Sequence, residues 1–415
     1  MGDRIIMPAG QQLLSTLFSH DWVLFFIIIA LILIGIVAIQ SATVDSGSQM
    51  KETNFQKQII WAILGLLIYF SISLINFRFL YALAYFALLA GILLVLLTYI
   101  PAISKGASGR WIGFGGLTIQ PSEFMKVFLI IGLARLLTDN IKNLSKPKSL
   151  ILPFIIAGVV TLLVLRQPDL GTAMVFPAIL FPMLFWSAVP VMTLFLIIAP
   201  IISLLSAFNL ISFVFWIGLI LLLLWFARKS LRFIVLMFLL NVSVGLVTPM
   251  MWNNIRPYQQ KRILTYVNKQ LDPRGSGYQV LQSKVAIGSG GMYGKGLGDG
   301  TQSQLKFLPE QHTDFIISLI GEELGFIGVS TVLLLFFFLL AKIINKASNS
   351  KNVFESLVLI GISALLLFQI FINIGMTTGL VPVTGLPLPF ISYGGSSLLA
   401  MMILMGLVQS VSRNI

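Results

Sequence analysis

The sequence contains no cysteine, only two histidines and few charged residues of either sign. The absence of cysteine excludes disulfides, thiolate catalysis and zinc sites built on cysteine. Two histidines in 415 residues also argue against a dedicated transition-metal site. Charged residues make up 10% of the chain, whereas an average soluble domain carries about 25%. The composition is therefore not that of an ordinary soluble enzyme.

Apolar residues are abundant instead, at 57% of the chain with a mean hydropathy of +0.98. Apolar runs of roughly 17–25 residues recur along the whole length, which is typical of a polytopic helical membrane protein. The alternating pattern of a membrane β-barrel does not occur in the sequence. We therefore predict an all-α fold, with residues 1–415 forming a single integral membrane domain. The first run, Trp22–Gln40, is interpreted as a retained span rather than a cleaved signal peptide.

About twelve transmembrane helices are predicted from these runs. The region Leu170–Ala227 holds 58 residues without a charge, too many for one or two crossings at about 1.5 Å per residue. The breaks "SAVP" and "SAFN" divide it into three. The predicted spans are 22–41, 57–75, 79–99, 121–138, 150–166, 169–187, 190–207, 211–227, 231–251, 313–341, 354–379 and 394–412.

Lysines and arginines in three short loops predict the orientation. These loops lie near residues 142–148, 228–232 and 342–351. With an even number of spans they fall on the same side as both termini, and that side is expected to be cytoplasmic. The segment 252–312 then forms one large extracytoplasmic loop.

This loop is basic, which suits an anionic ligand or anionic headgroups, although a merely solvated basic loop explains the charge equally well. Nucleic acid is not an expected partner, because no recognition helix or basic–aromatic platform is present. The stretch "GSGGMYGKGLGDG" (288–300) could form either a phosphate cradle or a flexible turn. The lysines and arginines of the loop are Arg256, Lys261, Arg262, Lys269, Arg274, Lys284, Lys295 and Lys306.

The scarce ionisable residues gather in "FLPEQHTDF" (307–315), directly before an apolar run. Glu310, His312 and Asp314 lie within five residues there. On one interpretation Thr313 is an N-cap and Asp314 a first-turn carboxylate, stabilised by the helix dipole by about 0.3–1 kcal/mol. On the other, Asp314 is a functional carboxylate. The spacing alone favours neither interpretation.

Other ionisable residues are predicted at or within the outer ends of the spans, which suggests a polar cavity that opens outward. In "QPSEFMK", Pro121 is suited to position N1, and Glu123 and Lys126 lie three residues apart on one helical face. Carboxylates within spans are costly and must find partners. The remaining members of this set are Arg110, Arg166, Asp169, Glu322 and Glu323.

Five ordered motifs make the chain resemble the RodA/FtsW/SpoVE (SEDS) family of bacterial cell-wall proteins, over nearly its whole length. They are "QPSE", "RQPDLGT", "GSGGMYGKGLGDGTQSQ", "FLPEQHTDF" and "LPLPFISYGGSS" (386–397). The stretches "GTQSQLKFLPE" and "DPRGSGYQVLQSK" (272–284) are closer to RodA, the elongation member, than to FtsW. The family pattern has ten spans, so the chain departs from it: region 170–251 holds four predicted spans where two are expected.

The resemblance implies a peptidoglycan glycosyltransferase that polymerises lipid II at the outer face of the bacterial cytoplasmic (inner) membrane during elongation. Its expected partners are lipid II with the growing lipid-linked glycan, a class B penicillin-binding transpeptidase and other membrane proteins of the elongation complex. The motif implies that Asp314 is the catalytic carboxylate. The residues expected to bind substrate or organise the cavity are Arg110, Glu123, Lys126, Asp169, Lys295, Lys306, Glu310, His312, Ser392 and Tyr393.

The expected reaction is a single inverting displacement on a lipid pyrophosphate. Asp314 would act as the general base, and the positive side chains would stabilise the leaving group. A divalent cation (Mg²⁺ or Mn²⁺) is an additional candidate for that stabilisation, and no organic cofactor is expected. Two alternatives stay open: a lipid II flippase, and a non-catalytic scaffold of the elongation complex. A transporter, however, usually carries charges near the midplane and two related halves, which the sequence does not show.

Overall fold

The computed structural model describes residues 20–44, 49–101, 104–105, 109–114, 117–144, 146–226, 231–254, 260, 276–305, 307 and 310–411. In this part of the chain, seven helices are long and apolar enough to cross a membrane, and four shorter apolar helices accompany them. The chain is thus a helical, multi-pass membrane protein, as the composition predicted.

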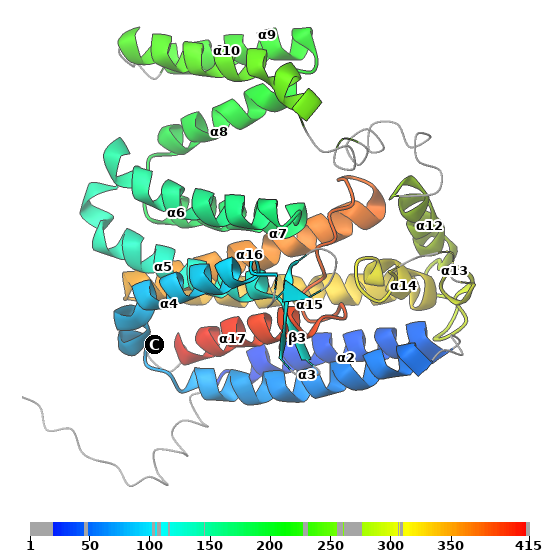
Figure 1. The fold of residues 1–415 in the computed structure, drawn as a ribbon. Coiled ribbons are helices and arrows are strands. Elements are labelled where there is room, and N and C mark those ends of the chain that lie inside the picture. The colour runs from blue at the N-terminus through cyan, green and yellow to red at the C-terminus, as the bar shows by residue number, and fades with distance from the viewer. Residues whose placement is uncertain are drawn as a thin grey trace, which may run out of the picture.

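Twelve apolar helices or broken helices form the part of the chain that the structure describes (Figure 1). They are α2 (Trp22–Val44), α3 (Gln49–Ser73), α4 (Phe77–Leu97), α5 (Pro121–Asp139), α6 (Pro147–Arg166), α7 (Leu170–Trp186), α8 (Val191–Ser206), α9 (Leu210–Phe226), α10 (Leu231–Asn254), α14 with α15 (Ile316–Glu323 and Gly325–Asn349), α16 (Val353–Thr378) and α17 (Gly395–Val411). Shorter helices are η1 (Ile141–Asn143), α12 (Ser276–Ser289) and α13 (Thr301–Gln304).

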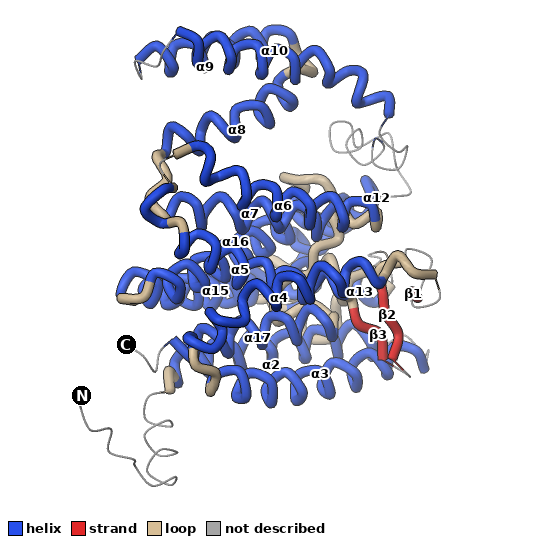
Figure 2. Tube along the Cα trace, turned by 60° about the vertical axis from the view of Figure 1, so that its left-hand side comes forward, coloured by secondary structure: helices blue, strands red, loops and turns tan. Residues whose placement is uncertain are grey.

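A small antiparallel sheet, which the all-α prediction missed, lies between α4 and α5 (Figure 2). Its strands are β1 (Ser104–Lys105), β2 (Trp111–Phe114) and β3 (Leu117–Ile119), in the order β1-β2-β3. Ile112 pairs with both Ser104 and Ile119. Strands this short carry almost no periodic signal, so composition pointed only to a loop. The sheet leads directly into the N-terminus of α5.

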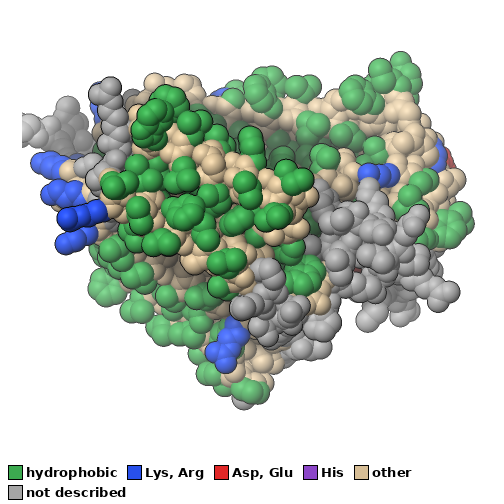
Figure 3. All heavy atoms as spheres, turned by 90° about the horizontal axis from the view of Figure 1, so that it is seen from above, with side chains coloured by type: hydrophobic (Ala, Val, Ile, Leu, Met, Phe, Trp, Pro, Cys, Tyr) green, Lys and Arg blue, Asp and Glu red, His purple; other side chains and the backbone are tan. Residues whose placement is uncertain are grey.

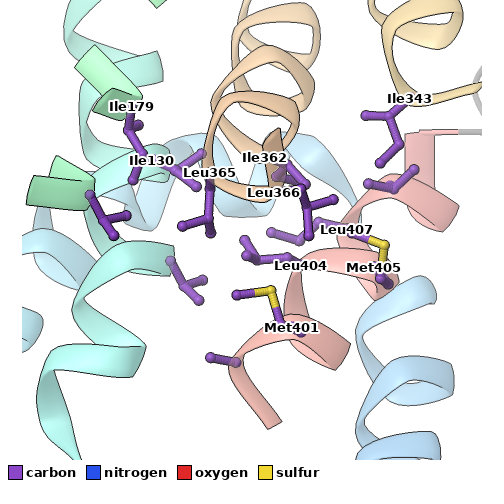
Figure 4. Close-up of a cluster of buried hydrophobic side chains, with 14 of the residues drawn as sticks. Ile130, Ile179, Ile343, Ile362, Leu365, Leu366, Met401, Leu404, Met405 and Leu407 are labelled. Atoms are coloured by element: carbon purple, nitrogen blue, oxygen red, sulfur yellow. The ribbon is translucent and has the colours of Figure 1, made fainter. Parts of the chain in front are cut away.

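Helix α16 is the centre of the main body. In its most apolar stretch 78% of the residues are buried, against 44% or less in the other long helices. It packs against α5, α7 and α15, while α17 packs against α3 and α5. The close-up in Figure 4 shows their apolar side chains meeting, among them Ile130, Ile179, Leu365, Met401 and Leu404. Because most of α16 is buried, the polar groups on its buried faces can be satisfied only by protein.

The predicted span 313–341 is not one helix but breaks between α14 and α15. Gly325 at the break has a φ of +64°, and a Cβ there would lie 2.3 Å from the Gly294 nitrogen. The Phe326 amide donates to the Gly291 carbonyl at 2.9 Å. The glycine-rich segment thus packs into the break, which requires residues without side chains on both sides.

The prediction that Thr313 caps this helix is wrong. The first residue of α14 is Ile316, its N-cap is Phe315, and no side chain caps it. Asp314 therefore lies before the helix, in a turn rather than in the first helical turn. Of the large loop predicted for 252–312, only 252–254, 260, 276–305, 307 and 310–312 are described; Arg256, Lys261, Arg262, Lys269, Arg274 and Lys306 lie outside the described residues.

Helices α8, α9 and α10 form a separate unit with its own apolar core, above α6 and α7 in Figure 1. The four spans predicted for 170–251 correspond to α7 in the main body and to these three helices. Viewed from above, hydrophobic side chains cover the outer face of α9 and α10 (Figure 3). This is the surface expected of helices in contact with lipid.

Hydrogen bonds among three polar side chains connect these helices, and we call the set of Ser203, Trp216 and Asn241 the polar knot. The Ser203 hydroxyl in α8 donates to Asn241 Oδ1 in α10 at 2.7 Å and accepts from Trp216 Nε1 in α9 at 3.0 Å. Ser203 and Asn241 are fully buried. In an apolar surrounding these hydrogen bonds specify which helix faces meet.

The Asn241→Leu substitution should therefore loosen this unit. It removes the acceptor of the Ser203 hydroxyl, and such interhelical bonds contribute about 0.6–2 kcal/mol in membrane proteins. We expect a lower midpoint of thermal unfolding for the detergent-solubilised protein. Ser243→Ala, on an exposed position of the same helix, is the matched control. Equal midpoints for the two variants would contradict the importance of the knot.

Candidate functional site

A cavity of about 850 Å³ lies where the sheet, the N-termini of α5 and α7, the turn before α14 and the segment before α17 meet. Its size falls within the range of about 300–1,000 Å³ typical of small-molecule sites. Four carboxylates and two cationic side chains face it. The residues that line it are Lys57, Trp61, Arg110, Trp111, Thr118, Gln120, Glu123, Pro168, Asp169, Leu170, Thr172, Glu310, Thr313, Asp314, Thr384, Gly385, Pro387, Tyr393, Gly394, Gly395, Ser396 and Ser397.

Asp314 reaches this cavity from a compact turn and is half-buried. The amides of Thr313, Asp314 and Phe315 all approach the Glu310 carbonyl, at 3.1–3.3 Å. Glu310 itself has a φ of +53°, a conformation that non-glycine residues seldom adopt. Glu310 is exposed and also lines the cavity. The motif thus places two carboxylates at the cavity, one partly shielded and one in solvent.

Ser392 and Tyr393, from the segment before α17, hold this turn from the side. The Tyr393 amide donates to the His312 carbonyl at 2.9 Å, and the Ser392 hydroxyl donates to the Thr313 carbonyl. The rings of His312 and Tyr393 lie 5.9 Å apart. Of the three residues only Tyr393 lines the cavity. Burial raises the pKa of Tyr393, so its hydroxyl stays protonated and can donate a hydrogen bond at neutral pH.

Glu123 and Lys126 form a buried ion pair near the start of α5, at 2.7 Å. Pro121 occupies the N-terminal position that the sequence indicated. Lys126 is fully buried, whereas Glu123 lines the cavity and its Oε2 has no hydrogen-bond partner in the described structure. Lys126 therefore orients the Glu123 carboxylate through this ion pair and does not line the cavity itself.

Asp169 caps α7 and is held on several sides. It accepts hydrogen bonds from the Thr172 amide and hydroxyl and from Gln120 Nε2, each at 3.1 Å. Arg110 approaches it to 3.8 Å and donates to the carbonyls of Gln167, at 2.8 Å, and Pro168. These bonds fix the Arg110 guanidinium at the wall of the cavity. Asp169 is thereby occupied with structure at the N-terminus of α7.

The glycine-rich segment, for which the sequence left a phosphate cradle and a flexible turn equally open, does not line the cavity. Lys295 instead forms an ion pair with Glu322 at 2.9 Å. The amides of Lys295 and Gly296 donate to the last carbonyls of α14, those of Glu322 and Glu323, at 3.0 and 3.1 Å. The segment is thus a cap for a broken helix. Lys306, the other lysine expected to bind substrate, lies outside the described residues.

Several cavity residues were missed in the sequence, above all Lys57 and Trp61 in α3. They lie four residues apart, and hence on one helical face, and both line the cavity. A lone lysine at the start of an apolar run is the only signal that marked them. Trp111 and Gln120, from β2 and the residue before α5, complete the same wall. With Arg110, Lys57 gives the cavity its positive charge.

Comparisons with known proteins match almost the whole chain to members of one family. The family described as cell cycle protein (FtsW, RodA, SpoVE) matches residues 21–216 and 209–415. Stage V sporulation protein E of Bacillus subtilis is 34% identical over 403 residues, covering 95% of this chain and 97% of the relative. The peptidoglycan glycosyltransferase RodA of Treponema pallidum is 31% identical over 428 residues, covering 95% and 98%.

A solved structure has the same fold. It was described as "structural coordination of polymerization and crosslinking by a peptidoglycan synthase complex", and its matching chain is 30% identical with a TM-score of 0.68. The match covers 95% of this chain and 98% of that one.

The Lys126→Met substitution should destabilise the protein strongly, because it leaves the buried Glu123 carboxylate without its partner. Breaking such a pair costs about 3–5 kcal/mol, whereas replacing both members by apolar residues is often neutral. The double variant Glu123→Leu/Lys126→Met is therefore expected to unfold at a higher temperature than Lys126→Met alone. Lys148→Met, at an exposed site, is the control. A double variant less stable than Lys126→Met would refute the buried pair.

Proposed function

Because the chain belongs to the FtsW, RodA and SpoVE family, we propose that it is a peptidoglycan glycosyltransferase that polymerises lipid II at the outer face of the cytoplasmic membrane. The observation that carries this proposal is a half-buried carboxylate, Asp314, in one cavity with two cations, Lys57 and Arg110. Glycosyl transfer from a lipid pyrophosphate needs this combination: a base for the attacking hydroxyl and positive charge for the leaving group.

In the proposed reaction the sugar 4-hydroxyl of an incoming lipid II attacks the anomeric carbon of the growing, lipid-linked strand. The bond from that carbon to the pyrophosphate oxygen breaks as the new glycosidic bond forms, and the hydroxyl proton passes to Asp314. General-base catalysis of this kind typically contributes about 10²–10⁴-fold. One displacement inverts the anomeric centre. Hydrolytic glycosidases use two carboxylates, but a pyrophosphate leaves readily without an acid.

The positive side of the cavity suits the pyrophosphate. Lys57 comes from α3 and Arg110 from the residue before β2, and the N-termini of α5 and α7 open into the same cavity. Helix N-termini carry partial positive charge and unpaired amides, which stabilise anions. A Mg²⁺ or Mn²⁺ ion would be held largely by the pyrophosphate itself, because no group of three or more histidines, aspartates or glutamates among the described residues could hold a metal ion. When bound, it would supply further positive charge at the leaving group.

We further propose that the cavity end of the bundle faces outward and that the protein works in the bacterial inner membrane with a class B penicillin-binding transpeptidase. Support for such a partner comes from the structural relative, which is described as a complex that coordinates polymerization and crosslinking. An elongation role rests on the RodA-like motifs. The additional helix pair beyond the ten-span pattern belongs to the unit of α8, α9 and α10, because α7 shares the main core.

The Asp314→Asn variant should bind lipid II but make no glycan polymer. The amide keeps the shape of the side chain and cannot accept the proton, so the loss of rate is expected to be at least about 100-fold. Purified protein in detergent, supplied with labelled lipid II, provides the test. Asp299→Asn, an exposed carboxylate outside the cavity, is the matched control. Polymer formation by Asp314→Asn at the rate of the control would rule out this base.

Activity in detergent also separates the enzyme from the alternatives. A flippase has no bilayer to act across under these conditions, and a scaffold makes no polymer. Dependence of polymer on Asp314 therefore supports only the glycosyltransferase.

The Lys57→Gln variant should bind lipid II about ten-fold or more weakly, because a charge-assisted hydrogen bond to phosphate contributes about 1.5–3 kcal/mol. The difference from the unmodified protein should shrink as ionic strength rises. Binding is measured by titration at two salt concentrations. Lys351→Gln, which removes an exposed lysine at the α15–α16 connection, is the control. Unchanged affinity in Lys57→Gln would assign the pyrophosphate to another part of the cavity.

A further inference from the structure

Three consecutive carbonyls in the turn that carries Asp314 are each held by the α16–α17 region. The Tyr393 amide donates to the His312 carbonyl at 2.9 Å, and the Ser392 hydroxyl donates to the Thr313 carbonyl. The Asp314 carbonyl accepts from the side-chain amide of Asn373 in α16 at 3.1 Å. Backbone that is neither helix nor strand needs such partners wherever water is excluded. The conformation of the turn is therefore set from outside the turn.

Asn373 differs from the other two donors because it holds two segments at once. Its Nδ2 also donates to the Leu386 carbonyl at 2.8 Å, and the residue is fully buried in the most buried of the seven long helices. The Asn373 amide group thus donates one hydrogen bond to the turn that carries Asp314 and one to the segment before α17. Hydrogen bonds in such an environment are stronger than in water, and their loss is correspondingly costly.

The second segment matters because Gly385, the residue before Leu386, lies beside the carboxylate. Gly385 has a φ of +78°, and a Cβ on it would lie 3.4 Å from Asp314 Oδ2. No other described atom lies within 4 Å of that Cβ position. Gly385 is exposed to the cavity and lines it together with Asp314. A side chain at position 385 would thus touch the carboxylate, and glycine leaves a gap on that side of Asp314 that opens to the cavity.

We propose that Asn373 is a positioning residue of this site, whose amide fixes the backbone of Asp314 and of the Gly385–Leu386 segment so that the carboxylate faces the gap where the acceptor hydroxyl binds. This inference rests on the proposed function, since it assumes that Asp314 is the base. Asn373 acts through the backbone and touches neither substrate nor cavity. It connects α16, a largely buried helix, to a carboxylate in an irregular turn.

The consequence is a specific kinetic signature. Proton transfer requires the base within about 2.6–3.2 Å of the hydroxyl, and a displacement of about 1 Å can reduce the rate about 100-fold. Binding of the pyrophosphate and lipid, in contrast, depends on side chains that Asn373 does not hold. Loss of Asn373 should therefore lower kcat and leave KM nearly unchanged.

Two substitutions test this, Asn373→Leu and Asn373→Ser. Leucine keeps the volume without any donor, and serine can satisfy the carbonyl of its own helix one turn back but is too short to reach Asp314. Gln369→Leu is the matched control. It lies one turn away on the same helical face, is equally buried, and neither amide atom has a hydrogen-bond partner among the described residues.

Polymerisation of labelled lipid II is measured in detergent, with rates expressed per folded molecule. We expect kcat to fall about 10–100-fold in the Asn373 variants, with KM within about three-fold of the unmodified value. Gln369→Leu should keep both within about two-fold. If Asn373→Leu does not fold, Asn373→Ser decides the outcome, since it retains a satisfied polar group in the helix.

Three results would overturn the inference: unchanged kcat in the folded Asn373 variants, a rise in KM alone, or an equal loss in Gln369→Leu. Unchanged kcat would mean that the turn keeps its conformation without Asn373. A rise in KM alone would mean that Asn373 contributes to substrate binding, and an equal loss in Gln369→Leu would mean that any substitution in this part of α16 lowers activity. These outcomes are distinct from failure of the proposed function. That failure is seen when Asp314→Asn remains active, whatever the Asn373 variants do.

Discussion

Every backbone group that leaves regular structure inside a membrane protein must find a partner within the protein, and the arrangement of the site follows from this constraint. The turn 310–315 and the segment before α17 are both irregular, and both lie at the cavity. Their carbonyls are satisfied by each other and by Asn373. The Asp314 carboxylate can therefore lie in a turn and face the cavity while the backbone carbonyls of the turn are hydrogen-bonded to protein.

The same constraint explains the glycine-rich segment. Helix α14 ends inside the protein, so its last carbonyls need donors. The amides of Lys295 and Gly296 supply them, and glycines are required because the two backbones approach so closely. Glu322 adds to this junction by accepting from Lys295 and from the amides of Gln302 and Ser303 in α13. A cluster that resembles a phosphate site in the sequence is therefore used to stabilise the chain just beyond Asp314.

The sequence predicted the helical class, the positions of the apolar helices and most of the cavity carboxylates, because long apolar runs and rare charges are local signals. It could not distinguish Lys295 from Lys57. Both are single lysines beside apolar residues, and only tertiary packing directs one to Glu322 and the other to the cavity. It also failed at Thr313, where a capping pattern is present but the helix begins three residues later. No local pattern marks Asn373. The role of an asparagine in an apolar helix depends on which carbonyls its side chain contacts in the folded protein.

The unit of α8, α9 and α10 shows how the chain could depart from the family pattern without disturbing this site. Its apolar core and its knot of Ser203, Trp216 and Asn241 are internal to the unit. None of its residues lines the cavity, and α8 meets the main body through α7. The unit thus adds apolar surface to the bundle without taking part in the contacts of α16, α17 and the turn of Asp314. Added helices are thus tolerated where the polar groups they bring satisfy one another.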